Sequence, residues 1–176
     1  MQSQAAPEHL AQSMMIDPQD EAVIALKDQA VKGIGDDPMK RAEAMRRYVY
    51  DKMEVKELSG GMSTSTDVAR TLRGDCTEHA VLLAAMLRAD GIPARTASGL
   101  VYAQAFAGLE NVFGYHMWTQ AYINGAWHNL DAAIDANHAF DATHILLRTS
   151  ALDDGATTND LVKMIPLMGR IAIEVE

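Results

Sequence analysis

A single cysteine lies at the predicted start of a helix that has almost no polar face. Asp75 and Glu78 have the spacing of a capping box, which starts a helix by satisfying free backbone N–H groups of its first turn. The helix is expected to end at residues 90–93 (Asp-Gly-Ile-Pro), because glycine suits the left-handed position after a helix and proline forbids continuation. The apolar run from Ala80 to Leu87 predicts that this helix is buried at the centre of the fold.

Cys76 falls in the first turn of this helix, where the positive end of the helix dipole favours an anion. A cysteine at such a position loses its proton more readily, and the thiolate is the nucleophilic form. Because Cys76 is the only cysteine in the chain, an internal disulfide and a multi-thiolate zinc site are excluded. A buried inert thiol, a reactive thiol and an intermolecular bridge remain as interpretations.

Composition narrows the class of partner and the number of domains. A net charge of -9 and a pI near 5.0 argue against nucleic acid or an anionic membrane surface as the partner. No apolar run reaches the roughly 20 residues that span a bilayer, and the N-terminus lacks a signal-peptide pattern. We predict a flexible lead at residues 1–16 and one domain at 17–176, with its core motifs at 68–133. Oligomeric state and cellular location stay open.

Two helices are predicted before the cysteine helix, each from a cap residue followed by proline: Asp17-Pro18 and Asp37-Pro38. The apolar positions of the second helix follow one stripe that predicts core packing: Met39, Ala42, Met45, Val49 and Met53. Its charged positions are predicted to cover the other side: Lys40, Arg41, Glu43, Arg46 and Arg47. Residues 58–67 are predicted to form a loop that leads into a short helical turn, and residues 103–115 a long surface connection or flap.

Residues 124–125 (Asn-Gly) lie between two alternating runs, which is the strongest short-range signal for a β-hairpin. A two-residue turn places Trp118 opposite Asp131, and alternation puts His116 on the same face as Trp118. His116 and Asp131 are then diagonal neighbours with Cβ atoms roughly 7 Å apart or less, within reach of a hydrogen bond. His128 falls on the opposite face.

A thiol at a helix N-terminus, an imidazole on a strand and a carboxylate on the next strand are the parts of a Cys-His-Asp acyl-transfer site. The thiolate of Cys76 would attack a carbonyl carbon, and His116 would move the proton to the leaving group. Asp131 would fix the tautomer of His116. The backbone N–H of Cys76 is the predicted oxyanion donor, with a second donor conceivable from residues 63–66.

At these residues the sequence resembles the transglutaminase-like superfamily, a papain-like group of thiol enzymes, in its bacterial type. The resemblance runs over four stretches: Gly74 to Ala80, Leu87 to Arg95 with Gly99, Tyr115 to Trp118, and Gly125 to Asp131. It implies an α+β fold in which the nucleophile helix packs on an antiparallel sheet, with helices before it. It also implies Cys76 as nucleophile, His116 as general acid/base and Asp131 as its orienter. The chemistry of such a triad requires no metal and no organic cofactor.

The resulting hypothesis is thiol-dependent acyl transfer on an amide of a peptide or protein substrate. The acceptor is either water, as in a peptidase or amidase, or an amine, as in a cross-linking enzyme. Trp118, Tyr115 and His79 are predicted to line the substrate site. Three departures from the family pattern leave the acceptor and the pocket open: Met117, Gln120 and Ala132.

Two other interpretations compete with this hypothesis. Cys76 and His79 could form a metal pair completed by His138 and His144, although zinc sites usually show two paired spacings. Alternatively, the chain could be a catalytically inactive module of the same fold that binds peptides in its cleft.

Overall fold

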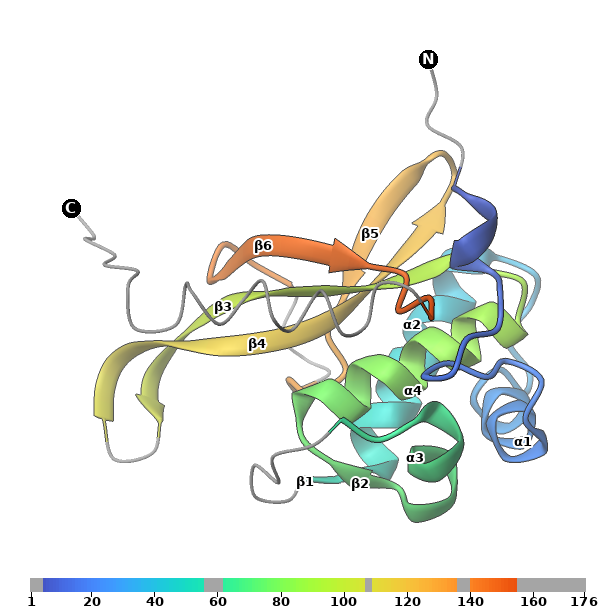
Figure 1. Ribbon diagram of the computed structural model, residues 1–176, viewed down its shortest axis with the longest axis horizontal. Coiled ribbons are helices and arrows are strands. Elements are labelled where there is room, and N and C mark those ends of the chain that lie inside the picture. Colours follow the sequence, from blue (N-terminus) through green and yellow to red (C-terminus); the bar gives the residue numbers. More distant parts are fainter. Residues whose placement is uncertain (1–4, 56–61, 107–108, 136–139, 155–176) are drawn as a thin grey trace.

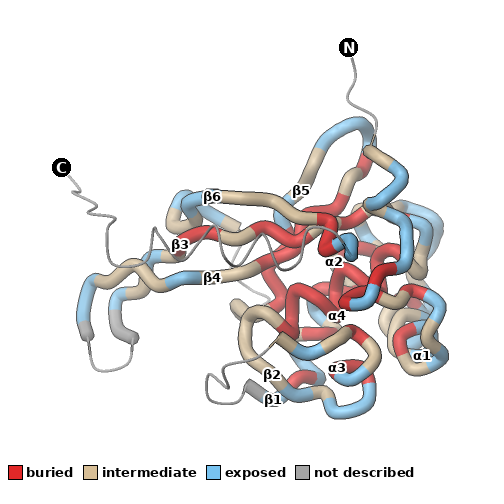
Figure 2. Tube along the Cα trace, in the orientation of Figure 1, coloured by how far each residue is buried: buried red, intermediate tan, exposed pale blue. Residues whose placement is uncertain are grey.

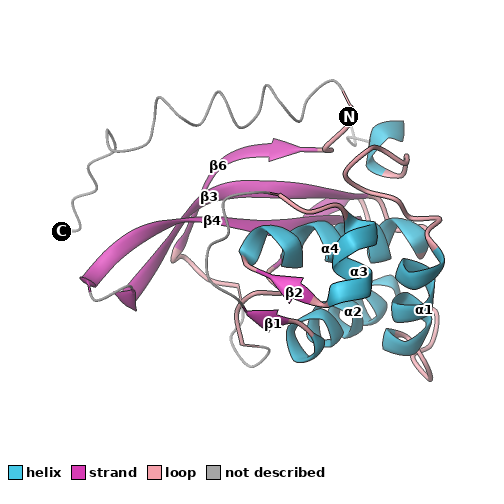
Figure 3. Ribbon diagram, turned by 60° about the horizontal axis from the view of Figure 1, so that its bottom comes forward, coloured by secondary structure: helices cyan, strands magenta, loops and turns pink. Residues whose placement is uncertain are grey.

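The structure is a computed structural model that describes residues 5–55, 62–106, 109–135 and 140–154 (Figure 1). Its helices, in chain order, are η1 (Pro7–His9), α1 (Glu21–Ala30), α2 (Pro38–Lys52), α3 (Ser65–Thr71) and α4 (Cys76–Ala89). Its strands are β1 (Glu54–Val55), β2 (Arg73–Gly74), β3 (Ala94–Phe106), β4 (Leu109–Ile123), β5 (Ala126–Leu130) and β6 (His144–Ser150). The fold is α+β as predicted, with helices α1 to α4 grouped on one side of the four-stranded antiparallel sheet (Figure 3).

Helix α4 is the centre of the fold, as the sequence predicts. Both halves of the capping box between Asp75 and Glu78 are present, and Gly91 has a positive φ of 78° just after the helix. Every residue from Glu78 to Arg88 is buried (Figure 2). The helix packs against α1, α2 and α3 on one side and against the sheet on the other, where Thr119 Oγ1 donates to the carbonyl of Ala80 at 3.0 Å.

The first helix starts later than the Asp17-Pro18 signal predicts. Helix α1 begins at Glu21, because the Asp20 side chain accepts hydrogen bonds from the backbone N–H groups of Ala22 and Val23. Asp17 instead accepts from the N–H of Gln19 in the preceding turn. Helix α2 starts where predicted, with Asp37 as its cap.

The stripe of helix α2 is confirmed, but its charged side is not entirely exposed. Ala42, Met45, Val49 and Met53 are buried. Arg46 was predicted to face solvent, and that prediction is wrong: it is only 5% exposed. Its position, four residues after Ala42 and three before Val49, lies on the edge of the buried stripe.

The segment 103–115 is not the flap or surface connection that we predict from sequence. Its described residues, 103–106 and 109–115, form the outer part of a long antiparallel hairpin of β3 and β4 (Figure 1). Within this hairpin Ala103 pairs with Val112. No Asn-Gly signal marks this hairpin, and pairing between the two strands supplies backbone hydrogen bonds that neither segment reveals alone. Helix α3 likewise begins at Ser65, inside the predicted loop, with Thr64 as its cap. Residues 58–61 of that loop lie outside the described residues.

The main sheet has the order β5-β4-β3-β6. The register of the β4–β5 hairpin is confirmed: Ile123 pairs with Ala126, and Gln120 pairs with Asn129. Asn124 and Gly125 both have the positive φ that a two-residue turn requires. A separate pair, β1 and β2, runs parallel.

Part of the predicted lead segment contacts the core. Ile16 has no exposed surface, and the carbonyl of Met15 accepts from the N–H of Ser65 at 2.9 Å. Within the described residues, no helix is long and apolar enough to cross a membrane. The last part of the predicted domain, residues 155–176, lies outside the described part of the chain.

Candidate active site

Cys76 is the first residue of α4, and its surroundings come from the capping box. The Asp75 carboxylate accepts from the N–H of Thr77 at 2.8 Å, and Glu78 accepts from the N–H of Asp75 at 3.0 Å. Glu78 also accepts from the N–H of Ser63 at 3.0 Å, which fixes the chain before α3 against the helix start. Cys76 itself is half-buried.

The hairpin brings His116 and Asp131 together as predicted. His116 Nε2 lies 2.5 Å from Asp131 Oδ2, and the two side chains are only 8% and 6% exposed. Burial lowers the pKa of His116, but hydrogen bonds to Asp131 and Cys76 and the charges of both raise it to about 9. Burial also raises the pKa of Asp131, and the hydrogen bonds it accepts from His116 and His144 hold that pKa well below its usual range. The pair is therefore an imidazolium and a carboxylate at neutral pH.

Cys76 is a neighbour of His116, since the two side chains interact by a hydrogen bond and by charge. The Nε2 atom of His116 is hydrogen-bonded to Asp131. Nδ1 is therefore the ring nitrogen that remains to interact with the sulfur of Cys76. One imidazole thus connects a carboxylate on one side with a thiol at a helix N-terminus on the other. This arrangement can hold a thiolate next to a cation and pass a proton to a leaving group.

The three residues predicted to line the substrate site differ in exposure. Trp118 is 1% exposed and stacks beside His116, with ring centroids 6.1 Å apart. His79 is also 1% exposed, and its Nδ1 lies 2.6 Å from the carbonyl oxygen of Asp75. Burial lowers the pKa of His79. Tyr115 is 39% exposed, so it alone of the three presents a large surface to solvent.

Sequence reasoning missed two side chains that contact Asp131. Arg46 Nη1 donates to the backbone carbonyl of Asp131 at 3.1 Å, and the spacing of Arg46 along the α2 stripe was the available signal. His144 Nε2 lies 3.0 Å from Asp131 Oδ2. No local pattern marks His144 for this contact, because it depends on how β6 is placed against β3. His128, by contrast, contacts the carbonyl of Ile123.

His116, Asp131 and His144 also form a group whose ligand-type atoms lie within 4.8 Å of one another. The separations of 2.5 and 3.0 Å from Asp131 Oδ2 are hydrogen-bond lengths, so the group as it stands is joined by protons. The metal site considered from sequence, with Cys76, His79 and His144 as ligands, is a different group of residues. In the structure His79 contacts Asp75, while His144 contacts Asp131. His138 lies outside the described residues.

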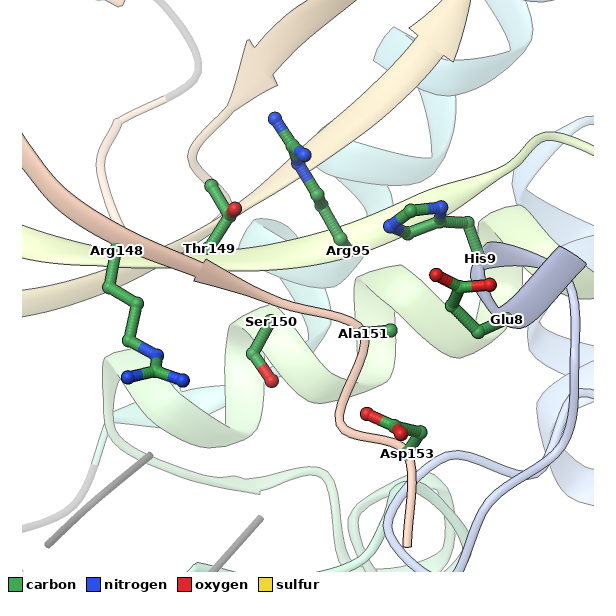
Figure 4. A pocket seen from close by; sticks show the side chains of 8 residues that line it. All are labelled: Glu8, His9, Arg95, Arg148, Thr149, Ser150, Ala151 and Asp153. Carbon is green, nitrogen blue, oxygen red and sulfur yellow. The ribbon is translucent and has the colours of Figure 1, made fainter. Parts of the chain in front are cut away.

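A pocket of about 250 Å³ lies where η1 approaches β3 and the end of β6 (Figure 4). Its lining combines acidic, basic and small side chains: Glu8, His9, Arg95, Arg148, Thr149, Ser150, Ala151 and Asp153. Arg95 lies over the ring of Trp127 at 3.9 Å and donates to Gln120. The pocket contains neither the thiol nor either member of the His116–Asp131 pair.

Comparison with known proteins identifies relatives of this arrangement. The transglutaminase-like superfamily matches residues 24–132, which is more than half of the chain. An uncharacterised protein of Mycobacterium leprae is 31% identical over 102 residues, which are 56% of this chain and 36% of the relative. The chain thus spans about a third of the length of that relative.

The solved structures that share the fold include two bacterial proteins. A candidate cysteine protease from Cytophaga hutchinsonii superimposes with a TM-score of 0.62 at 24% identity, covering 81% of this chain and 46% of the other. The periplasmic domain of TgpA from Pseudomonas aeruginosa superimposes with a TM-score of 0.53 at 22% identity, covering 70% of this chain and 45% of the other. Both matches span less than half of the compared structure.

Proposed function

This chain belongs to the transglutaminase-like superfamily, and we propose that it catalyses thiol-dependent acyl transfer on amide bonds of peptide or protein substrates. The observation that carries the proposal is the alignment of Cys76, His116 and Asp131. The imidazole contacts both the sulfur and a carboxylate that is almost fully buried. The likeness to a structure described as a candidate cysteine protease supports the same chemistry.

In the proposed mechanism the Cys76 thiolate attacks the carbonyl carbon of the amide, and a C–S bond forms as the carbonyl electron pair moves to oxygen. When the C–N bond breaks, His116 gives its proton to the departing amine, and a thioester remains on Cys76. Water or an amine then attacks the thioester, His116 takes a proton from it, and the thiolate leaves. Throughout these steps Asp131 keeps the ring of His116 oriented and compensates its positive charge.

The oxyanion formed in each step needs hydrogen-bond donors. The backbone N–H of Cys76, at the N-terminus of α4, is the proposed first donor. A second donor is conceivable from residues 63–66, but two N–H groups of this segment are already engaged: Ser63 donates to Glu78, and Ser65 donates to Met15. A second donor from this segment therefore has to be a group other than these two.

The proposal is tested by alkylation of Cys76 with iodoacetamide over a range of pH, followed by mass spectrometry. Because an imidazolium stabilises the thiolate, we expect labelling to persist well below the ~8.5 midpoint of a free thiol. His116→Ala should move the midpoint of labelling to higher pH. His128→Ala is the matched control and should leave it unchanged, since His128 contacts only the Ile123 carbonyl among the described partners.

Turnover is the second part of the test. A library of peptide amides, offered with and without a fluorescent primary amine, should yield either hydrolysis or amine incorporation that Cys76→Ser reduces by about 10³-fold or more. A labelling midpoint above ~8 that ignores His116, together with no covalent adduct from any substrate, would instead identify an inactive peptide-binding module.

A further inference from the structure

The carboxylate of Asp131 contacts two imidazoles rather than one. Its Oδ2 atom lies 2.5 Å from His116 Nε2 and 3.0 Å from His144 Nε2. Its Oδ1 atom accepts from the N–H of Ala133 at 2.8 Å. Both carboxylate oxygens therefore have fixed donors, and rotation of the carboxylate would break at least two hydrogen bonds.

His144 is itself held tightly. Its side chain is 4% exposed, at the first residue of β6, which pairs with Val101 of β3. Phe140 lies against its ring with centroids 4.1 Å apart, and Trp118 meets it edge-on at 5.4 Å. On the other side of the ring, Nδ1 lies 3.2 Å from Thr143 Oγ1. These contacts leave Nε2 aimed at Asp131.

We propose that His144 is a positioning residue of the acyl-transfer site, whose Nε2–H holds the Asp131 carboxylate in the orientation that His116 requires. The inference rests on the proposed function of Cys76, His116 and Asp131. It adds a residue from outside the stretch that matches the family, since that match ends at residue 132.

The proposed effect on chemistry runs through Asp131. A carboxylate fixed by Ala133 and His144 presents Oδ2 to His116 in one geometry, so the imidazolium that stabilises the thiolate keeps its partner. Without the donor at His144, the carboxylate gains freedom to turn away. The imidazolium then loses part of its stabilisation, and the thiolate loses part of its own.

Other charged groups lie near His144, Asp131 and His116 and contribute to the electrostatics of the site. Asp141 Oδ1 lies 3.7 Å from His144 Nδ1, on the side away from Asp131. The charge of Arg46 interacts with that of Asp131 from α2, and His79 interacts with Asp131 and His116 from α4. Asp141 loses its charge interaction and hydrogen bond with the imidazole in every His144 variant alike, whereas Arg46 and His79 keep their own interactions with the site in the parent and in each variant.

The test compares His144→Gln with His144→Phe in the full chain. Glutamine can place an N–H near the position of Nε2 but loses the ring, whereas phenylalanine keeps the contacts with Phe140 and Trp118 but has no donor. We expect His144→Phe to lower kcat about tenfold with little change in KM, and to raise the pH midpoint of Cys76 alkylation by about half a unit. His144→Gln should retain most of both values.

A double variant separates positioning from packing. In an Asp131→Asn background, His144→Phe should have almost no further effect on the alkylation midpoint, because both changes act through one carboxylate. If His144→Phe does not fold, His144→Asn takes its place, since its amide is one methylene too short to reach Oδ2.

Equal behaviour of the glutamine and phenylalanine variants, a fall in the alkylation midpoint, or full additivity with Asp131→Asn would each overturn the proposal. These outcomes bear on His144 when the alkylation midpoint of the parent responds to His116→Ala. A failure of the proposed function is distinct, because it would appear as a midpoint that ignores His116, together with no covalent adduct from any substrate.

Discussion

Helix α4 has a buried charged group near each of its ends, and the two differ in their partners. Near its first residue, Asp131 is 6% exposed and contacts two imidazoles, His116 and His144. In its last turn, Arg88 is 4% exposed and, within the described part of the chain, donates only to backbone carbonyls. Those carbonyls belong to three separate segments: Ala94 is 6 residues from Arg88 in sequence, whereas Ala11 and Ala151 are 77 and 63 residues away.

Asp131 and Arg88 are thus about equally buried but have different roles. Burial lowers the pKa of Arg88 to about 10, so it stays charged at neutral pH, and backbone carbonyls cannot take its proton. The Arg88 cluster can hold segments together but cannot move protons. The partners of Asp131 are groups that can gain or lose a proton, and one of them contacts a thiol. A buried charge thus points to chemistry only when its partners are themselves titratable.

The largest effect is expected from Asp131→Asn. The amide keeps the shape of the carboxylate but loses the charge that raises the pKa of His116. Turnover should fall on the order of 10³-fold, and the alkylation midpoint of Cys76 should rise, by less than in His116→Ala. Asp28→Asn, at a carboxylate that is 62% exposed, is the control and should change neither value. Unchanged turnover in Asp131→Asn would show that Asp131, like Arg88, has no role in the chemistry.

Arg88→Met should produce the opposite pattern, with loss of stability and no change in the chemistry. Removing the guanidinium leaves the carbonyls of Ala11, Ala94 and Ala151 without this donor. Since buried acceptors without partners are costly, urea unfolding should show a loss of roughly 2–4 kcal/mol. The alkylation midpoint should stay at the parental value.

A surface arginine provides the matched control for this change. Arg73→Met, at a side chain that is 53% exposed, should cost no more than about 0.5 kcal/mol. A shift of the Cys76 midpoint in Arg88→Met would mean that the two buried clusters are coupled through α4.

The pH dependence of the free energy of unfolding should also differ between His116, near the start of α4, and Arg88, near its end. This effect is expected to be smaller than the two above. The pKa of His116 is raised from 6.5 to about 9, so its contribution to stability is complete below pH 6.5 and is lost as pH rises through 9. As pH rises from 6.5 through 9, the difference in the free energy of unfolding between the parent and His116→Gln should therefore shrink, by at most about 3 kcal/mol. The difference between the parent and Arg88→Met should stay constant from pH 6.5 to 9. A constant difference for His116→Gln as well would contradict an imidazolium at this position.

Local signals in the sequence were sufficient for much of this site. The capping box at Asp75 and Glu78 placed Cys76 at a helix start, and the Asn-Gly turn fixed the register that joins His116 to Asp131. These predictions succeed because they depend on contacts between residues less than about 20 positions apart. The start of α1 failed for a local reason, since Asp20 competes with Asp17 for the cap.

The sequence by itself determined the central helix, the hairpin that joins His116 to Asp131, and the order of thiol, imidazole and carboxylate. Only the tertiary structure decided which further groups reach Asp131 and Arg88. His144 is brought to Asp131 by the pairing of β6 with β3, Arg46 by the packing of α2, and the partners of Arg88 by three separate segments. Such contacts follow from the arrangement of whole elements in space. A buried charge must find partners wherever the folded chain provides them, and no short pattern of residues records where that is.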